Sequence, residues 1–454
     1  MKNIFKLLII SLVLIVASAA LFACENPYDS STGTVEDKDY VEELKLDMQS
    51  PTAKTEATVK TFIDGDTTHF KVPESVVPGG VLKARYLAID TPESTGQIEE
   101  YGKKAADFTK TKLKNAVSIM LESDDGTWNP DSTGSRYLVW IWYKPSEAAD
   151  YRNLNLEILQ NGLCKKKSTL DTKYGDVCVK ALEQSMRQKL NMYSGKKDPD
   201  FYYGDVINLT MRELRLNIEN YNRKKVAVDG LITRVFNNGC FVQDYDAETD
   251  MTYGIYVYYL MSNGFTKDIM VPGNYVHIVG TTTQFEATGQ YQISGLIDYS
   301  PYDKNNPETT HLISSGNEIE FPVVSADKYL GKETIQIEVP DENDPEKTVL
   351  KKIESDYSKL HFHTTIAMEN LTVTRVSTTA SNGEMTLTCT VNGKTVKVRT
   401  DTLYDENKQV ITADYFEGKT IDIRGIVYSY KYNEDAEEQY QIQLLTLSDV
   451  TIKS

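Results

Sequence analysis

The pattern of apolar and polar positions predicts a mainly β protein from residue 58 onward. Strand-like runs, in which apolar residues alternate with polar ones or follow each other directly, cover 58–72, 81–91, 117–125 and 136–143. Helical stretches, in which apolar residues recur every three or four positions, cover 101–117, 154–163 and 175–193. This order of strands and helices predicts a small β-barrel flanked by helices, which we place at residues 57–197.

A weak internal repeat organises the rest of the chain. Its landmarks are "GLITRV" (230–235) and "LTVTRV" (371–376), then "YVHIVG" (275–280) and "TIDIRG" (420–425), then "YQI" at 291 and at 440. Three landmarks in the same order indicate a duplicated unit. The strand-like runs and the V-x-V-x-G pattern are typical of a Greek-key barrel such as an OB-fold. We therefore expect OB-like β-domains at 198–300 and 356–454, joined by an acidic linker at 301–355 with apolar stretches that pack on a neighbour.

The first residues follow the pattern of a targeting segment. Lys2 and Lys6 precede an apolar run that is slightly shorter than the about 20 residues of a transmembrane helix. The run ends in "LFAC", which resembles the lipobox of bacterial lipoproteins. We therefore expect a signal peptide at 1–23, a lipid on Cys24 and a disordered acidic tether at 24–56. An ordinary signal peptide or an uncleaved helix is the alternative, and each version places the remaining chain outside the cytoplasm.

Composition narrows the function classes. The chain has 454 residues, of which 40% are apolar and 25% charged, as in globular proteins. Its formal net charge of −17 argues against a protein coated uniformly for nucleic acid, but it leaves local basic patches open. The four cysteines after Cys24 are too few and too scattered for a disulfide framework. Cys178 lies on an apolar helical stripe and is expected to be a buried thiol, with a Cys164–Cys178 bridge as the alternative.

Two short motifs concentrate charged side chains where strands meet turns. They are "IDGDTTHF" (63–70) and "RYLAIDTPE" (85–93). Asp66 and Asp90 each lie at such a junction, and two carboxylates with carbonyl oxygens nearby suit a hard cation such as Ca²⁺ or Mg²⁺. Asp64 by itself is an ordinary turn residue. In a regular strand Arg85 and Asp90 point to opposite faces, because their separation is odd. Their convergence therefore requires the turn to re-aim one of them.

These motifs belong to a wider resemblance. The blocks, in order, are "IDGDT", "RYLAIDTPE", "YGKKAADFTK", "DSTGSRYLVWIW" and "NLNLEILQNGL". Over roughly residues 57–195 the chain resembles the staphylococcal nuclease (thermonuclease) family. The resemblance implies an OB-fold-type five-stranded barrel and a Ca²⁺-dependent endonuclease that hydrolyses phosphodiester bonds of DNA and RNA. It also implies a preference for single strands and 3′-phosphate products.

The resemblance assigns roles residue by residue. It implies that the Ca²⁺ ligands are the carboxylates of Asp66 and Asp90 and the carbonyl of Thr91. Glu93 corresponds to the general base, and Arg85 and Arg136 correspond to the residues that bind the phosphate. Arginine suits this task because its planar, permanently charged fork donates two hydrogen bonds to phosphate oxygens. The turn before Arg136 is one residue longer than the family's usual turn and lacks its tyrosine.

Two further groups are candidates for contact with nucleic acid. The lysines either form a basic rim or are solvated helix faces, and they are Lys103, Lys104, Lys165 and Lys166. The aromatic residues of the first C-terminal unit either stack on bases or are ordinary sheet residues, and they are Phe236, Phe241, Tyr256 and Tyr258.

The sequence therefore predicts a monomeric, secreted and lipid-anchored Ca²⁺-dependent nuclease at the outer face of a bacterial membrane. Its OB-like domains position the substrate or contact a cell-surface partner. Two other function classes stay open, namely a non-catalytic nucleic-acid-binding module and a surface adhesin or scaffold. Family members that only bind typically lose the acids and arginines of the site, and this chain keeps them.

Overall fold

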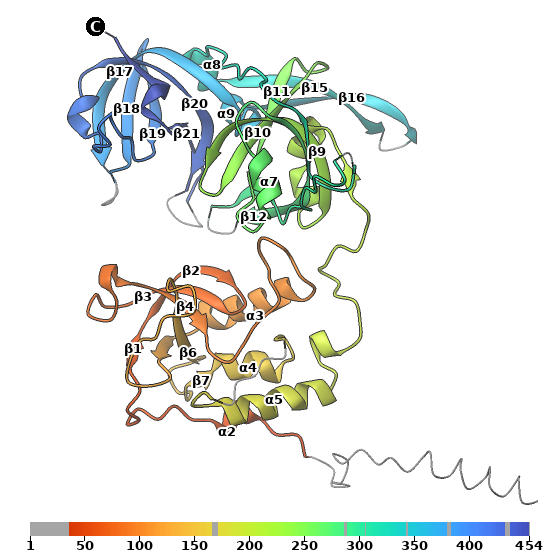
Figure 1. Cartoon of the computed structure of the whole chain (residues 1–454), viewed down its shortest axis with the longest axis vertical. Helices are drawn as coiled ribbons and strands as arrows, with labels where there is room; N and C mark the ends of the chain where they lie inside the picture. The colour runs from red at the N-terminus through yellow and green to blue at the C-terminus, as the bar shows by residue number, and fades with distance from the viewer. Residues whose placement is uncertain are drawn as a thin grey trace, which may run out of the picture.

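The described residues form three β-barrels, and an extended segment of chain leads from the first barrel to the other two (Figure 1). The computed structural model describes residues 36–165, 171–285, 288–304, 306–341, 344–378, 383–431 and 436–453. In Figure 1 the first barrel lies below, and the two C-terminal barrels lie side by side above it. No helix in the described ranges is both long enough and apolar enough to cross a membrane.

The first barrel follows the predicted order of strands and helices. Its strands are β1 (Lys54–Glu56), β2 (Thr58–Asp64), β3 (Thr67–Lys71), β4 (Val81–Tyr86), β5 (Ser118–Glu122), β6 (Tyr137–Lys144) and β7 (Arg152–Asn153). Its helices are α3 (Gly102–Lys114), α4 (Leu154–Gln160) and α5 (Gly175–Arg187), with short 3-10 turns η1 (Pro78–Gly80) and η2 (Asn191–Tyr193). The strand order β1-β5-β6-β4-β3-β2 closes into a barrel because β1 runs almost directly into β2. Only the β4–β6 pair within it is parallel.

Sequence patterns located these elements, but several end earlier than predicted. β4 ends at Tyr86 instead of residue 91, α3 at Lys114 instead of 117, and α4 at Gln160 instead of 163. The helix predicted over 175–193 ends at Arg187, because Lys189 and Asn191 have positive φ values of 54° and 41°. Such values are incompatible with a continuing α-helix. The start of α4 is set by Asn153, whose side chain accepts a hydrogen bond from the Leu156 N–H at 2.9 Å. The core is aromatic and aliphatic, and Trp140 and Trp142 are fully buried within it.

The structure differs from the expected tether from residue 36 onward. A short helix, α2 (Tyr40–Glu43), begins at Asp39, whose carboxylate accepts the N–H groups of Val41 and Glu42. Val41 is 2% exposed and belongs to the core of the first barrel, and β1 pairs with β5. Burial of this side chain and pairing of this strand hold the segment against the barrel. The predicted signal peptide, Cys24 and the first part of the predicted tether lie outside the described residues.

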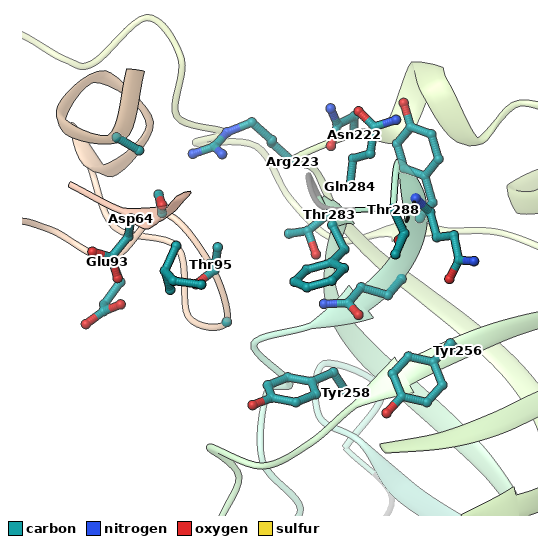
Figure 2. Close-up of a pocket in the computed structure, with 18 of the residues that line it drawn as sticks. Asp64, Glu93, Thr95, Asn222, Arg223, Tyr256, Tyr258, Thr283, Gln284 and Thr288 are labelled. Carbon is teal, nitrogen blue, oxygen red and sulfur yellow. Dashed lines mark hydrogen bonds between the residues drawn. The ribbon is translucent and has the colours of Figure 1, made fainter. Parts of the chain in front are cut away.

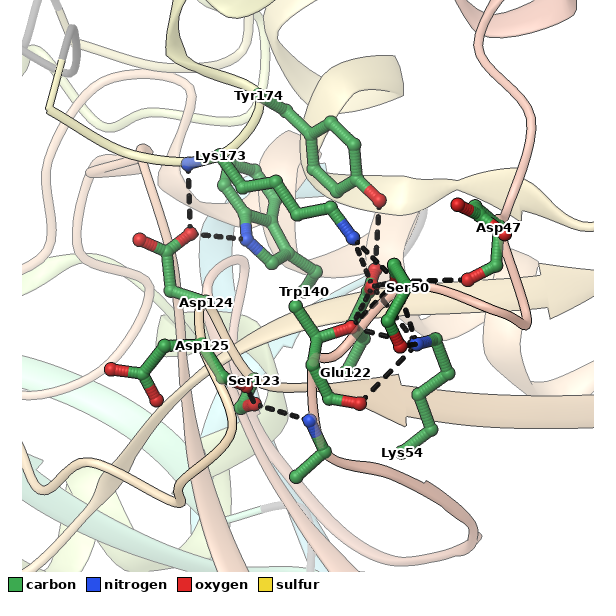
Figure 3. Close-up of polar contacts among 12 residues, drawn as sticks. Asp47, Ser50, Lys54, Glu122, Ser123, Asp124, Asp125, Trp140, Lys173 and Tyr174 are labelled. Carbon is green, nitrogen blue, oxygen red and sulfur yellow. Dashed lines mark hydrogen bonds and ion pairs between the residues drawn. The ribbon is translucent and has the colours of Figure 1, made fainter.

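A buried carboxylate fastens this segment to the barrel (Figure 3). Glu122, at the end of β5, is 0% exposed and accepts hydrogen bonds from the Trp142 indole at 2.8 Å and the Tyr174 hydroxyl at 3.0 Å. Further donors are Thr52 Oγ1 at 2.6 Å and Lys173 Nζ at 2.7 Å. Burial alone would raise the pKa of Glu122, but these donors hold it below its ordinary value.

We expect Glu122→Gln to lower the free energy of unfolding by about 2 kcal/mol at pH 7, because the amide cannot satisfy both lysine and hydroxyl donors. A depressed folded-state pKa stabilises the protein above the ordinary glutamate pKa, and this contribution is lost as pH falls through the folded-state value. The difference between wild type and variant should therefore shrink in acid. Urea titrations at several pH values measure it, with the exposed Glu147→Gln as control. If the difference in the free energy of unfolding does not change with pH, the ionised carboxylate of Glu122 does not stabilise the protein as expected.

The two C-terminal barrels share one topology. The first contains β9 (Lys225–Phe236), β10 (Gly239–Asp246), β11 (Met251–Tyr258), β12 (Tyr275–Phe285) and β13 (Gln290–Ser294). The second contains β17 (Thr365–Thr378), β18 (Met385–Val391), β19 (Lys394–Thr400), β20 (Thr420–Tyr430) and β21 (Gln439–Leu444). Both rings have the first strand paired with the second and the fourth, and the third strand paired in parallel with the fifth. The repeat landmarks lie on equivalent strands, so the expected duplication and the OB-type fold are confirmed.

Smaller elements complete these barrels. They are β8 (Ile207–Asn208), α6 (Met211–Leu216), η3 (Ile218–Tyr221), α7 (Gly264–Ile269), α9 (Tyr357–Leu360), η4 (Ala413–Tyr415), η5 (Leu447–Asp449) and β22 (Val450–Ile452). The segment expected as a linker is folded, and it forms β14 (His311–Ser314), α8 (Ala326–Tyr329), β15 (Lys332–Asp341) and β16 (Asp344–Asp356). Its apolar residues pack on both neighbours: Ile335 joins the core of the first C-terminal barrel and Tyr329 joins that of the second.

Candidate active site

Carboxylates and one arginine meet at one end of the first barrel. The turn between β2 and β3 carries Asp64 and Asp66, and β4 carries Arg85. Arg85 Nη1 donates to Asp66 Oδ1, and Nη2 donates to Asp90 Oδ1 at 2.5 Å. The guanidinium therefore bridges the two carboxylates that the sequence predicted as metal ligands.

A backbone irregularity makes this bridge possible. β4 ends at Tyr86, and Ala88 has a φ of 65°, which is uncommon for a residue with a side chain. This left-handed residue reverses the alternation of the strand, so the side chain of Asp90 comes to the same side as that of Arg85. Ala88 is buried, so the surrounding barrel holds it in this conformation.

Asp66 is the most enclosed acid of the group. It is 1% exposed, and it accepts hydrogen bonds from the Thr91 N–H at 2.9 Å and the Thr67 hydroxyl at 3.0 Å. Burial, and then the charge of Asp64, raise the pKa of Asp66 to about 7 even though Arg85 opposes the shift. A buried carboxylate that is repelled by a neighbouring acid is stabilised in its ionised form by a further positive charge close by.

Asp64 is the functional candidate that sequence reasoning missed. The motif "DGD" is most often only a turn, and nothing in the sequence distinguishes its first aspartate. In the structure Asp64 is buried, and its pKa is raised by burial and then by the charge of Glu93. The pKa of Glu93 is raised in turn, by burial and then by the charge of Asp66. The charges of Asp64, Asp66 and Glu93, the predicted base, therefore influence one another.

The backbone of Glu93 is held from two sides. Its N–H donates to Glu99 Oε2 at 2.8 Å, and its carbonyl accepts the Glu99 N–H at 2.9 Å. Glu99 is itself paired with Lys165, whose Nζ lies 2.6 Å from Glu99 Oε2. At the start of α3, a Cβ on Gly102 would lie 2.1 Å from the Glu93 carbonyl oxygen. Helix α3 can therefore approach the loop this closely only with glycine at that position.

We expect Gly102→Ala to lower the nuclease activity that the family resemblance implies about tenfold or more, because the added methyl group must push the loop that carries Glu93 out of place. The matched control is Gly264→Ala, where a Cβ meets open space and the backbone is ordinary. Cleavage rates and thermal unfolding of both variants test this expectation. Equal activity of the two variants would contradict the close packing of α3 on the loop.

The segment that follows α4 supports the other acid, Asp90. The Asp90 N–H donates to Cys164 Sγ at 3.2 Å, and the Asp90 carbonyl accepts the Lys165 N–H at 2.8 Å. Cys164 and Cys178 are both buried, as expected for Cys178, and they do not form the alternative disulfide bridge. Burial raises the pKa of Cys178 to about 12, so this thiol stays protonated.

The remaining predicted residues are placed less centrally. Arg136 lies two residues before Leu138, the β6 residue paired with Arg85, and its guanidinium bonds to Asp131 of its own turn at 2.7 Å. Of the predicted lysines, Lys103 pairs with Asp107, Lys104 is exposed and Lys165 pairs with Glu99. Lys166 lies outside the described residues. The structure thus brings Arg85 and the acids together, whereas Arg136 interacts within its own loop.

The donor set suits a hard cation. Carboxylate and carbonyl oxygens of Asp66, Asp90 and Thr91 are the ligand types that Ca²⁺ prefers. A nearby cation would oppose the burial and the like-charge repulsion that raise the pKa of Asp64 and Asp66. In the described parts of the chain, no group of three or more His, Cys, Asp and Glu side chains is already arranged to hold a metal ion. The guanidinium of Arg85 occupies the space between Asp66 and Asp90 instead.

Comparison with known proteins identifies the first barrel. Residues 83–195 match the model of the family described as staphylococcal nuclease homologue. The chain is 27% identical over 139 residues to the thermonuclease of Staphylococcus intermedius, an alignment that covers 30% of this chain and 74% of that protein. The family match includes Arg85, Asp90 and Glu93, whereas Asp66 precedes it. Together with the closed OB-type barrel, these matches show that the chain contains a domain of the staphylococcal nuclease family.

Proposed function

We propose that the protein is a Ca²⁺-dependent nuclease that hydrolyses phosphodiester bonds of DNA and RNA, prefers single strands and leaves 3′-phosphate ends. The observation that carries the proposal is the bridge from Arg85 to Asp66 and Asp90, with Glu93 electrostatically linked to the same acids. A non-catalytic binding module would not need this costly group of buried charges.

Each residue has a task in the proposed reaction. Glu93 holds the attacking water and takes its proton, and its raised pKa brings it closer to the strength that a general base needs near neutral pH. Two of the five N–H groups of Arg85 are used by Asp66 and Asp90, so others remain to donate to the phosphate oxygens. Arg136 is proposed as a second donor once it leaves Asp131. Water adds to phosphorus as its proton passes to Glu93, the bond to the 5′ oxygen breaks, and the departing 5′ oxygen takes up a proton from solvent water.

A bound Ca²⁺ would be held by Asp66, Asp90 and the Thr91 carbonyl, and it would supply Lewis-acid stabilisation of the negative charge on the phosphate. Asp64 does not need to contact the ion, because its charge next to Asp66 already makes the site favourable for a cation.

The test is to incubate the full chain with single-stranded DNA and with RNA, in Ca²⁺ and in EGTA. We expect cleavage only in Ca²⁺. Undiminished cleavage in EGTA would refute the metal requirement, and no cleavage under any condition would favour a binding module. A second measurement does not depend on activity: Ca²⁺ should raise the melting temperature of the wild type and raise it less for Asp66→Asn.

We also propose that the protein is anchored by a lipid on Cys24 at the outer face of the cell membrane. The proposal rests on Lys2 and Lys6, the apolar run that follows them and the "LFAC" ending. Cys24→Ala should move the protein from the membrane fraction to the soluble fraction of the cell. An unchanged distribution would argue for a different form of attachment.

A further inference from the structure

A large cavity lies between the candidate active site and the C-terminal barrels. Its volume is about 740 Å³, which is within the range of ligand-binding pockets. Figure 2 shows Asp64 and Glu93 on one side of it and Tyr256 and Tyr258 on the other. The cavity is therefore continuous with the acids of the nuclease domain.

The two sides are joined next to Glu93. The Ser294 hydroxyl at the end of β13 donates a hydrogen bond to the Gly96 carbonyl at 3.2 Å. A Cβ on Gly295 would lie 2.4 Å from the same oxygen, so the two backbones are in close contact. The loop that follows Glu93 thus rests directly on the first C-terminal barrel, and this contact fixes where the barrel presents its surface.

The barrel wall of the cavity is aromatic. Along β11 the alternation of side chains buries Ile255 and Val257 in the barrel core and turns Tyr256 and Tyr258 outward into the cavity. The Tyr256 hydroxyl donates to the carbonyl oxygens of Phe236 and Asn237, at 2.6 and 3.0 Å, which fixes its ring.

Other rings differ in how far they reach the cavity. Phe285, at the end of β12, also lines the cavity and is 46% exposed. Phe241 was a candidate for stacking in the sequence, but it is fully buried and cannot stack on a ligand. Phe236, Tyr291 and Tyr428 line the cavity as well. Tyr258, which turns outward from β11, and the exposed Phe285 are the two rings on which we base the inference.

Polar side chains lie between the rings and the acids. Arg223 lines the cavity and extends toward the nuclease side (Figure 2). Its φ is 64°, and its backbone N–H donates to the Thr282 carbonyl at 2.6 Å, so the loop is held in an unusual conformation that aims this arginine. Gln284 and Gln290 also line the cavity, and their amide nitrogens donate to the Gly289 carbonyl and to Ser429. Their amide oxygens are hydrogen-bond acceptors.

We propose that this cavity holds the unpaired nucleotides next to the bond that is cleaved, with their bases stacked on Tyr258 and Phe285 and their phosphates near Arg223. The inference rests on the proposed function, because a phosphate placed at Arg85 and Glu93 requires its neighbouring nucleotides to occupy the adjoining space. An unpaired base offers both ring faces for stacking, whereas a base in a duplex is covered on both faces by its neighbours. The first C-terminal barrel therefore selects single strands for the nuclease domain.

The test measures binding of a fluorescent twelve-residue oligothymidylate to the full chain carrying Glu93→Gln, so that binding is read without cleavage. Adding Tyr258→Ala or Phe285→Ala should raise the dissociation constant about 5- to 150-fold, the range for loss of one base–aromatic stack. Tyr258→Phe keeps the ring and should bind as before. Tyr302→Ala is the matched control, because Tyr302 is 93% exposed and does not line the cavity.

Binding that stays within twofold for both alanine variants would overturn the inference, and so would an equal loss with Tyr302→Ala. If Tyr258→Ala fails to fold, as judged by its thermal unfolding, the exposed Phe285 decides the question. The outcome is separate from that of the proposed function. If the wild-type chain cleaves nothing but binds the oligonucleotide through Tyr258, the proposed nuclease activity is refuted and nucleotide binding in the cavity is retained. If the chain cleaves and these rings have no effect on binding, the nuclease activity is retained and nucleotide binding in the cavity is refuted.

Discussion

Glu93→Gln is expected to lower kcat on single-stranded DNA by about 10²–10³, the loss that follows removal of one preorganised group that acts in the transition state. Glutamine keeps the size and the backbone contacts with Glu99, but it cannot take a proton from water. Because the pKa of Glu93 is raised, kcat/KM of the wild type should fall with decreasing pH at a point above the ordinary glutamate pKa. In Glu93→Gln, the fall in kcat/KM with decreasing pH should differ from that of the wild type, because the variant lacks this titrating carboxylate.

The control for this prediction is Glu74→Gln, which makes the same chemical change at an exposed position between β3 and β4. It should turn over like the wild type. Steady-state rates with saturating oligonucleotide separate kcat from KM, and the dissociation constant of Glu93→Gln checks that the substrate still binds. Wild-type turnover by Glu93→Gln would remove Glu93 from the mechanism.

Arg85→Ala is expected to have the second large effect, and it should act on activity and stability together. It should lower kcat by about 10² or more, because a phosphate-binding donor is lost. It should also lower the free energy of unfolding by about 3 kcal/mol, because Asp66 stays buried without its counter-charge. The pKa of Asp66, already raised to about 7, should rise further, so the variant should be least stable relative to wild type above neutral pH.

The stability of this barrel can be measured by itself, because all three tryptophans of the chain, Trp128, Trp140 and Trp142, lie in the first barrel. Tryptophan fluorescence during urea titration therefore reports on this domain. Lys83→Ala is the control, because Lys83 is an exposed cation on the same face of β4, two residues before Arg85. Arg85→Lys should fall between wild type and Arg85→Ala, since an ammonium keeps the charge but not the planar fork. Equal stability of the Arg85→Ala and Lys83→Ala variants would mean that the bridge contributes nothing.

The expected tether and linker show one limit of reasoning from sequence. Polar, acidic segments with few apolar residues predict extended chain. Here single buried residues decide otherwise: Val41 enters the core of the first barrel, and Ile335 and Tyr329 enter those of the C-terminal barrels. One apolar side chain in a polar segment gives no periodic signal in the sequence. Its burial depends on the surface of the folded barrel on which it packs, and only the tertiary structure shows that surface.

By itself, the sequence determined the strand and helix segments of the first barrel, the duplication of the C-terminal barrels and the motifs around Arg85 and Asp90. These follow from local periodicity and from short runs of residues. The tertiary structure alone decided how the motifs act. Arg85 reaches Asp90 because the buried Ala88 adopts a left-handed conformation, and Asp64 becomes part of the site because the fold buries it beside Asp66. The cavity between Glu93 and Tyr258 joins residues far apart in the chain, and only the packing of separate domains can create such a site.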